Sequence, residues 1–309
     1  MTNLAPSHPF TGQASVLDRT GDTPLVALEG IWCKLEFLNP SGSVKARLAR
    51  YLIEQAEAEG RLRPGDTIVE ATSGNTGNAL AQVAAVKGYR MLVVLPKGIS
   101  SERAAISQAY GAEIAEVGDF HVNQALAYAQ ELGEQPGYFC PRQFASEHNV
   151  AENREWLGPE ILAQLPAGRT PDALVMGVGT GGTLIGAGQA LRAVNPECLT
   201  VAVEPAESPT IATGTVARHR IEGISDGFVP DIIDRHRDEI DELVTVTSDD
   251  AIAEMRRLGP AHGCFVGPSS GAHVLAAKAL RQRRPELDTV VTLLCDCGEK
   301  YFSEYFRPG

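Results

Sequence analysis

The sequence lacks any stretch that approaches the ~20 consecutive apolar residues of a transmembrane helix. Its N-terminal segment, MTNLAPSHPFTGQ, has neither the charged start nor the apolar centre of a signal peptide. Basic residues are also scarce, with 27 Lys and Arg against 39 Asp and Glu, which leaves a net charge of −12. A surface of this sign repels the phosphate backbone of nucleic acids. We therefore expect a soluble, cytoplasmic protein without a membrane or nucleic-acid partner.

Cysteine is infrequent, and the six thiols are dispersed along the chain. This pattern predicts reduced thiols in a cytosolic protein and not a disulfide framework. Cys295 and Cys297 lack a second ligand pair, and the seven histidines show no metal-binding spacing such as H-E-x-x-H. We predict no metal site, and we expect most histidines to lie at the surface or at helix ends.

Segments with helix-like and strand-like periodicity alternate along the chain, which is typical of parallel α/β proteins. Helices are expected at residues 44–59, 75–88, 100–111 and about 149–165, and after residues 180, 248 and 269. Strands are expected at residues 66–72, 90–96, 113–118, 172–179, 199–205, 242–247 and 288–296. The N-cap of the third helix is expected at Ser100 or Ser101, and that of the helix near residue 248 at Ser248 or Asp249. We predict two α/β lobes around a cleft, with ligands at the carboxyl ends of the strands.

Four turns that open helices are unusually rich in Gly, Ser, Thr and Asn. They are SGSVK (41–45), TSGNTG (72–77), GTGGT (179–183) and PSSG (268–271). A helix N-terminus offers unpaired backbone N–H groups, and small residues let an anion approach them closely. Any one of these turns could be an ordinary helix cap. The four together favour a ligand that carries phosphate and carboxylate groups.

Lys45 lies at the first of these turns. A lysine near a helix start is most often a solvated surface charge. The apolar neighbours Val44 and Leu48, and the lack of an acidic residue in the first turn, permit burial of Lys45 instead. Burial or imine formation would leave the amine unprotonated near neutral pH and nucleophilic. We therefore expect Lys45 to react with an aldehyde of the ligand.

Several motifs together resemble one enzyme family. They are GDTPLV (21–26), KLEFLNPSGSVKAR (34–47), EATSGNTG (70–77), GTGGT (179–183) and GPSSGA (267–272). In order and spacing they resemble the cysteine synthase and cystathionine β-synthase family of fold-type II pyridoxal-phosphate enzymes, and within it the O-acetylserine sulfhydrylases most. The resemblance implies a two-lobed, tryptophan synthase β-like fold in which each lobe is a twisted, mostly parallel sheet flanked by helices. It implies a smaller, mobile, substrate-clamping lobe at residues 36–149, and a larger lobe that binds the cofactor phosphate at residues 12–35 and 150–309.

The resemblance also implies roles for individual residues. Lys45 would form the internal aldimine with pyridoxal 5′-phosphate and would then act as general base at the substrate Cα. Asn75 would bond the cofactor's O3′, and Ser269 its pyridine nitrogen. The cofactor phosphate would be bound by Gly179, Thr180, Gly181, Gly182 and Thr183. The substrate carboxylate would be bound by Thr72, Ser73, Thr76 and Gln143.

The reaction implied is a β-replacement on an activated serine. O-acetylserine would lose acetate to leave an α-aminoacrylate, and sulfide would add to it to give L-cysteine. A cystathionine β-synthase-like or S-sulfocysteine-forming reaction with a different nucleophile is the alternative. The short chain, without a C-terminal regulatory module or a haem-binding extension, favours a simple cysteine synthase. The resemblance implies a homodimer.

The sequence departs from the family's pattern at a few positions. Ala46 stands where Asp is usual, and we expect this to affect the positioning of Lys45 more than the reaction class. Ser225 and Asp226 stand where small residues are typical, and both are candidate substrate contacts. If Asp226 faces the cleft, it would disfavour anionic nucleophiles and attract an ammonium group, although a solvent-facing turn residue is the favoured interpretation. Trp156 would either reshape the cleft or pack a helix.

The main alternative class is an NAD-dependent dehydrogenase. Residues 177–182 fit G-x-G-x-x-G after a strand, and Glu204 ends the next strand about where a ribose-binding acid belongs. That interpretation leaves Lys45, TSGNTG and GPSSGA without a role. An inactive cofactor-binding scaffold is the other class, and the presence of Lys45 argues against it.

Overall fold

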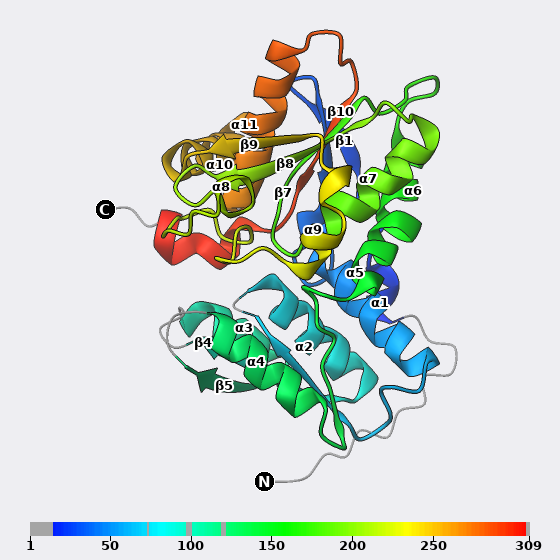
Figure 1. Cartoon of the computed structure of the whole chain (residues 1–309), viewed down its shortest axis with the longest axis vertical. Coiled ribbons are helices and arrows are strands. Elements are labelled where there is room, and N and C mark those ends of the chain that lie inside the picture. The colour runs from blue at the N-terminus through cyan, green and yellow to red at the C-terminus, as the bar shows by residue number, and fades with distance from the viewer. Residues whose placement is uncertain (1–14, 73, 97–100, 119–121, 307–309) are drawn as a thin grey trace.

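The computed structural model describes residues 15–72, 74–96, 101–118 and 122–306 of the 309-residue chain. The described residues form two separate sheets, one of six strands in the order β1-β2-β10-β7-β8-β9 and one of four in the order β5-β4-β3-β6. All neighbouring strands are parallel except β1 and β2. Figure 1 shows the two sheets in two stacked bodies. The predicted α/β architecture is confirmed.

The larger body is built on the six-stranded sheet. Its strands are β1 (Leu25–Leu28), β2 (Ile31–Leu35), β7 (Ala173–Gly177), β8 (Leu199–Pro205), β9 (Glu242–Val246) and β10 (Val290–Leu294). Its helices are α5 (Glu147–Glu152), α6 (Gly158–Gln164), α7 (Gly182–Val194), α8 (Thr210–Thr213), α9 (Asp231–Arg235), α10 (Ser248–His262) and α11 (Pro268–Arg283). Successive side chains of β7 point to opposite faces, so Val175 joins the core beneath α11 while Leu174 joins the core beneath α7. Because helices cover both faces, β7 is buried along its whole length.

The smaller body is built on the four-stranded sheet. Its strands are β3 (Thr67–Ala71), β4 (Arg90–Pro96), β5 (Glu113–Val117) and β6 (Tyr138–Phe139). Its helices are α2 (Asn75–Lys87), α3 (Ser101–Ala109) and α4 (Val122–Gly133), and α1 (Lys45–Ala58) packs beside α2. Ala49 and Ile53 of α1 share a core with Leu80 and Val83 of α2. The domain bounds predicted above remain a prediction.

Short helical segments complete the chain. They are the 3-10 helices η1 (Val16–Arg19), η2 (Glu36–Leu38), η4 (Arg237–Glu239) and η5 (Gly298–Tyr301), and the π-helical turns η3 (Asn153–Leu157) and η6 (Phe302–Phe306). The helix predicted near residues 149–165 is thus three consecutive pieces, with a π turn in its middle. No helix among the described residues combines the length and the apolar character that a membrane span requires.

The N-cap predicted for α10 is wrong by one or two residues. Thr247, not Ser248 or Asp249, is extended and accepts a hydrogen bond from the Asp250 N–H (3.1 Å). The Ser248 hydroxyl accepts the N–H of Arg220 instead (2.9 Å), so it serves a loop and not the helix. The cap of α3 lies partly outside the described residues, since α3 begins at Ser101 and Ser100 is not among them.

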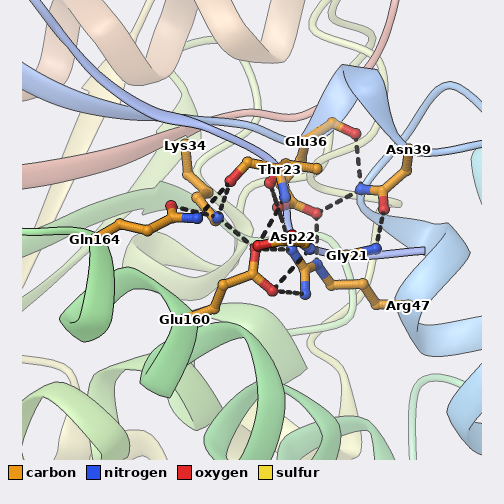
Figure 2. A network of polar contacts seen from close by, with 9 residues as sticks. All are labelled: Gly21, Asp22, Thr23, Lys34, Glu36, Asn39, Arg47, Glu160 and Gln164. Carbon is orange, nitrogen blue, oxygen red and sulfur yellow. Dashed lines mark hydrogen bonds and ion pairs between the residues drawn. The ribbon is translucent and has the colours of Figure 1, made fainter. Parts of the chain in front are cut away.

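A buried network of charges ties the start of α1 to the large sheet (Figure 2). The Arg47 guanidinium donates to the Glu36 carboxylate (2.8 and 2.9 Å) and to the Glu160 carboxylate (2.8 and 2.7 Å). Lys34 also pairs with Glu160, and the side chains of Lys34, Glu36 and Arg47 are fully buried. The Glu160 carboxylate further accepts the N–H groups of Asp22 and Thr23 (3.0 Å each). Because α1 begins at Lys45, this network determines where that lysine lies.

We predict that Glu160→Gln lowers the free energy of unfolding by about 2–3 kcal/mol near neutral pH, because Arg47 and Lys34 lose a buried anionic partner. Burial alone would raise the pKa of Glu160, but Arg47 and Lys34 outweigh it and lower this pKa from 4.5 to about 2. A depressed pKa contributes stability above the unfolded value of 4.5, and this contribution is lost as the pH falls toward 2. Urea unfolding across this pH range should therefore show that the difference in the free energy of unfolding between variant and wild type shrinks as the pH falls. The exposed Glu286→Gln is the control, and a pH-independent difference for Glu160→Gln would contradict the prediction.

Candidate active site

One cavity lies where strands of both sheets end and helices begin. It encloses about 1040 Å³ of space, counting its opening to solvent. Most of the residues predicted from the sequence line it, namely Lys45, Thr72, Asn75, Thr76, Gln143, Gly179, Thr180, Gly181, Thr183, Asp226 and Ser269. Gly182 is the first residue of α7, in the same turn, and Ser73 lies outside the described residues. The structure thus brings together side chains that are up to 224 positions apart in the sequence, from Lys45 to Ser269.

Lys45 is the first residue of α1, and its side chain faces the cavity. Within the described part of the chain, no group lies within hydrogen-bond or ion-pair distance of Lys45 Nζ. Burial lowers the pKa of Lys45, and the nearby groups of Cys295, Glu152 and Asp226 oppose this shift without reversing it. An enclosed amine without a partner is favoured in the neutral form, which is the nucleophilic one. The side chain therefore fits an electrophilic ligand such as an aldehyde.

Residues 179–183 form the turn between β7 and α7. Gly181 is the N-cap of α7, with φ +89°, and its carbonyl accepts the first hydrogen bond of the helix from Ile185. The N–H groups of Gly182, Thr183 and Leu184 precede that bond and have no partner within the helix. A Cβ at residue 179 would lie 2.6 Å from the Gly223 carbonyl oxygen, and one at residue 182 only 2.1 Å from Asn149 Oδ1. The glycines therefore let the backbone pack closely and leave its N–H groups for an anion, as a phosphate site requires.

A second helix start lines the same cavity. Gly74 is the N-cap of α2 and supplies no side-chain cap, so the first N–H groups of α2 are also available to an anion. Beside them the Thr76 hydroxyl donates to Gln143 Oε1 (2.6 Å), and Gln143 Nε2 donates to the Ala71 carbonyl (3.2 Å). These bonds hold Thr76 and Gln143 at the cavity wall. The arrangement suits a carboxylate, which agrees with the role predicted for this turn.

His273 is a cavity residue that the sequence analysis missed. Most histidines were expected at the surface or at helix ends, whereas His273 is fully buried on α11, one turn after Ser269. Its Nε2 accepts the Gly177 N–H (2.8 Å), and its Nδ1 lies 3.0 Å from the Leu293 carbonyl oxygen. Burial lowers the pKa of His273 to about 4, so the ring is neutral at physiological pH. In the sequence, the only indication that His273 belongs to the site is that it follows Ser269 by four residues, about one turn of a helix.

Lys300 and Tyr301 also line the cavity without having been predicted. Lys300 Nζ donates to Asn75 Oδ1 (2.6 Å), and Asn75 Nδ2 donates to Asp296 Oδ2 (2.7 Å). The Tyr301 hydroxyl donates to the same Asp296 oxygen (2.6 Å). Asn75 therefore lies at the cavity wall between an ammonium and a carboxylate.

Three of the unusual positions differ in their relation to the cavity. Asp226 was favoured as a solvent-facing turn residue, but it lines the cavity while keeping much of its surface exposed. Ser225 does not line the cavity, because its φ of +55° turns the hydroxyl inward to the Ser208 carbonyl (3.0 Å). Trp156 packs against the guanidinium groups of Arg47 (5.2 Å) and Arg50 (5.7 Å), and it is a packing residue outside the cavity wall.

The dehydrogenase interpretation fails at Glu204. This carboxylate is buried and accepts the N–H groups of Ile211 (2.7 Å) and Ala212 (3.0 Å) at the start of α8. It is therefore engaged within the protein and does not face the cavity as a ribose ligand would.

Comparison with known proteins agrees with the geometry. The family model for pyridoxal-phosphate dependent enzymes matches residues 16–296. O-ureido-L-serine synthase of Streptomyces lavendulae is 42% identical over 303 residues, 96% of this chain and 93% of that protein. Cysteine synthase of Staphylococcus aureus is 41% identical over 292 residues, 92% of this chain and 93% of that protein.

Solved structures of enzymes with similar sequences also have a similar fold. That of O-ureido-L-serine synthase has a TM-score of 0.88 at 41% identity, and the match covers 96% of each chain. The O-acetylserine dependent cystathionine beta-synthase from Helicobacter pylori has a TM-score of 0.89 at 33% identity, covering 96% of this chain and 99% of that one.

We predict that Lys45→Ala abolishes covalent attachment of pyridoxal phosphate after borohydride reduction, as measured by mass spectrometry of the tryptic peptides. Because Lys45 Nζ has no partner among the described residues, its removal should not lower the unfolding temperature of the cofactor-free protein. Lys87→Ala, which removes a lysine paired with Glu57 far from the cavity, is the control and should label as wild type does. Labelling of another lysine in wild type, such as Lys300, would refute the assignment.

Proposed function

The chain belongs to the family of pyridoxal-phosphate dependent enzymes, and from this premise we propose that it makes L-cysteine and acetate from O-acetyl-L-serine and sulfide. That it is a cysteine synthase-like enzyme of β-replacement follows from its relatives. The observation that best supports the proposed reaction is the enclosed Lys45 amine, which has no partner among the described residues and shares its cavity with two helix starts that suit anions. A phosphate, an aldehyde carbon and a carboxylate can then be bound at once.

The residues present fit pyridoxal phosphate. The N–H groups of residues 179–183 would hold its phosphate, Lys45 its aldehyde carbon, and the buried Ser269 hydroxyl its ring nitrogen. When bound, the cofactor supplies a ring that withdraws electrons from the substrate Cα. A hydroxyl at Ser269, unlike a carboxylate, does not require that ring nitrogen to be protonated. The weaker electron withdrawal that results favours elimination over transamination.

The chain's own residues supply binding and proton transfer. Thr72, Thr76, Gln143 and the first N–H groups of α2 would bind the substrate carboxylate, and Ser73 is proposed to join them. Lys45 Nζ would take the proton from the substrate Cα, because the lowered pKa of Lys45 favours the neutral, basic amine. Movement of the part of the proposed substrate-clamping lobe (residues 36–149) that carries the start of α2 would then exclude water from the cavity.

Asp226 is proposed to select the second substrate. It lines the cavity, and its negative charge acts on Lys45. An anion such as thiosulfate would be repelled there, whereas hydrogen sulfide or an amino-acid thiol such as homocysteine would be tolerated. This favours a cystathionine-forming activity over an S-sulfocysteine-forming one as the second candidate function.

The proposal is tested by offering the purified enzyme O-acetylserine, O-phosphoserine and serine, each with sulfide, thiosulfate or homocysteine, and identifying the products by mass. We expect cysteine from O-acetylserine and sulfide to be formed fastest. A faster product with another nucleophile would replace the proposed substrate while leaving the reaction class intact.

We predict that Asp226→Ala raises the rate with thiosulfate relative to sulfide about tenfold, because a negative charge near the attacking anion is removed. The first half-reaction, loss of acetate, should change less than about twofold, since the attacking anion takes no part in it. Stopped-flow absorbance follows the first step, and product formation follows the second. Asp249→Ala, an exposed residue paired with Arg220, is the control. Equal effects on both half-reactions would contradict the role of Asp226.

We also propose that the enzyme works in the cytoplasm as a homodimer. All six cysteines are free thiols, which suits a reducing compartment. The dimer is expected from the family resemblance, and light scattering of the purified protein measures it.

A further inference from the structure

The segment that follows β10 holds three parts of the site together. Val44 N–H donates to the Cys295 carbonyl (2.9 Å), and Cys297 N–H donates to the Gly42 carbonyl (3.0 Å). On its other side, Gly267 N–H donates to the Asp296 carbonyl (3.0 Å). Residues 295–297 therefore lie between the loop that leads to Lys45 and the turn that leads to Ser269.

Two side chains of this segment hold the third part, Asn75. Lys300 Nζ donates to Asn75 Oδ1 (2.6 Å), and it also donates to the carbonyls of Ser41 and Gly42 (3.2 Å each). Asp296 Oδ2 accepts from Asn75 Nδ2 (2.7 Å). Asp296 is 1% exposed and Lys300 is 9% exposed, so these are bonds within the protein and not surface contacts.

The order of these partners determines which way the amide of Asn75 points. Lys300 can only donate, and an ionised Asp296 can only accept. A flipped amide would place its NH₂ group against the ammonium and its oxygen against the carboxylate, and both bonds would be lost. The amide NH₂ group has two hydrogens, and Asp296 uses one of them. The second hydrogen remains available to a ligand in the cavity that Asn75 lines.

We propose that Lys300 and Asp296 are positioning residues that hold the Asn75 amide so that its second N–H is presented to the ring hydroxyl of bound pyridoxal phosphate. The proposal rests on the proposed function and on the cofactor contact expected of Asn75. Other residues also pack closely against Asp296. The Tyr301 hydroxyl donates to it (2.6 Å), and a Cβ at Gly267 would lie 2.3 Å from Asp296 Oδ1. Asp296 therefore has little freedom to turn away from Asn75.

Burial lowers the pKa of Lys300, while Asp296, Cys297 and Glu299 oppose the shift. Asn75 thus lies between Lys300 and Asp296, two side chains of opposite formal charge that each bond to its amide. Loss of either charge removes the preference for one amide orientation. It should therefore weaken the cofactor contact of Asn75 without removing the contacts of the phosphate.

The experiment is a double-mutant cycle of Lys300→Met and Asn75→Ala, read out as the Kd of pyridoxal phosphate and the absorption maximum of the bound cofactor. Lys300→Met alone should raise the Kd about tenfold, the effect of one lost hydrogen bond of about 1.4 kcal/mol. It should also move the absorption maximum, because the ring hydroxyl loses its donor. In the Asn75→Ala background the same substitution should change the Kd less than about twofold, because the residue through which Lys300 acts is gone.

Lys278→Met is the matched control, because it removes a lysine of α11 that pairs with Glu29 and Glu254 away from the cavity. It should leave both readouts unchanged. If Lys300→Met does not fold, Asp296→Asn keeps the size of the side chain and removes the opposite charge, and it should give the same non-additivity with Asn75→Ala.

An equal effect of Lys300→Met in both backgrounds, or a lowered unfolding temperature with unchanged Kd and absorption maximum, would overturn the proposal. The first result would mean that Lys300 acts independently of Asn75, and the second that it only supports the loop at residues 41–42. Failure of the wild-type chain to bind pyridoxal phosphate would instead refute the proposed function, so the two failures are distinguishable.

Discussion

The pairing of Arg47 with Glu36 and Glu160 is the interaction on which the geometry of the site depends. The Arg47 guanidinium is buried and contacts both carboxylates, so the start of α1 cannot move without leaving charges unpaired in the interior. Lys45 lies two residues earlier in the same helix. The charge network therefore places at the cavity wall an amine for which the described part of the chain offers no partner, next to strands that come from distant parts of the chain.

The loop before Lys45 is held a second time, by backbone bonds to residues 295 and 297. This double attachment holds the first turn of α1 without an acidic side chain at Ala46, where the family resemblance leads us to expect Asp. Ala46 is 2% exposed, and its neighbours Val44 and Arg47 already have their partners in Cys295, Glu36 and Glu160. A carboxylate at position 46 is not needed to fix the first turn of α1.

The sequence predicted the features that are encoded locally. The alternation of strands and helices was visible as periodicity, and the turns at residues 72–77 and 179–183 were visible as runs of small residues. Contacts across the fold were not predictable in the same way. Asp296 and Lys300 were not predicted, because nothing in CDCGEK indicates that residue 75 will lie between them. Buried His273 was missed for the same reason, since its partners Gly177 and Leu293 come from two other strands.

The positions of the polar groups divide the chemistry into two parts. Lys45, the turn at residues 179–183 and the start of α2 are proposed to bind the cofactor and the amino-acid substrate. They correspond to the motifs that carry the family resemblance, and the first half of the proposed reaction depends on them. Asp226 comes from the separate segment that follows Ser225 and meets them only in the folded chain. A change at Asp226 is therefore expected to alter the choice of nucleophile while the proton transfer proposed for Lys45 is retained.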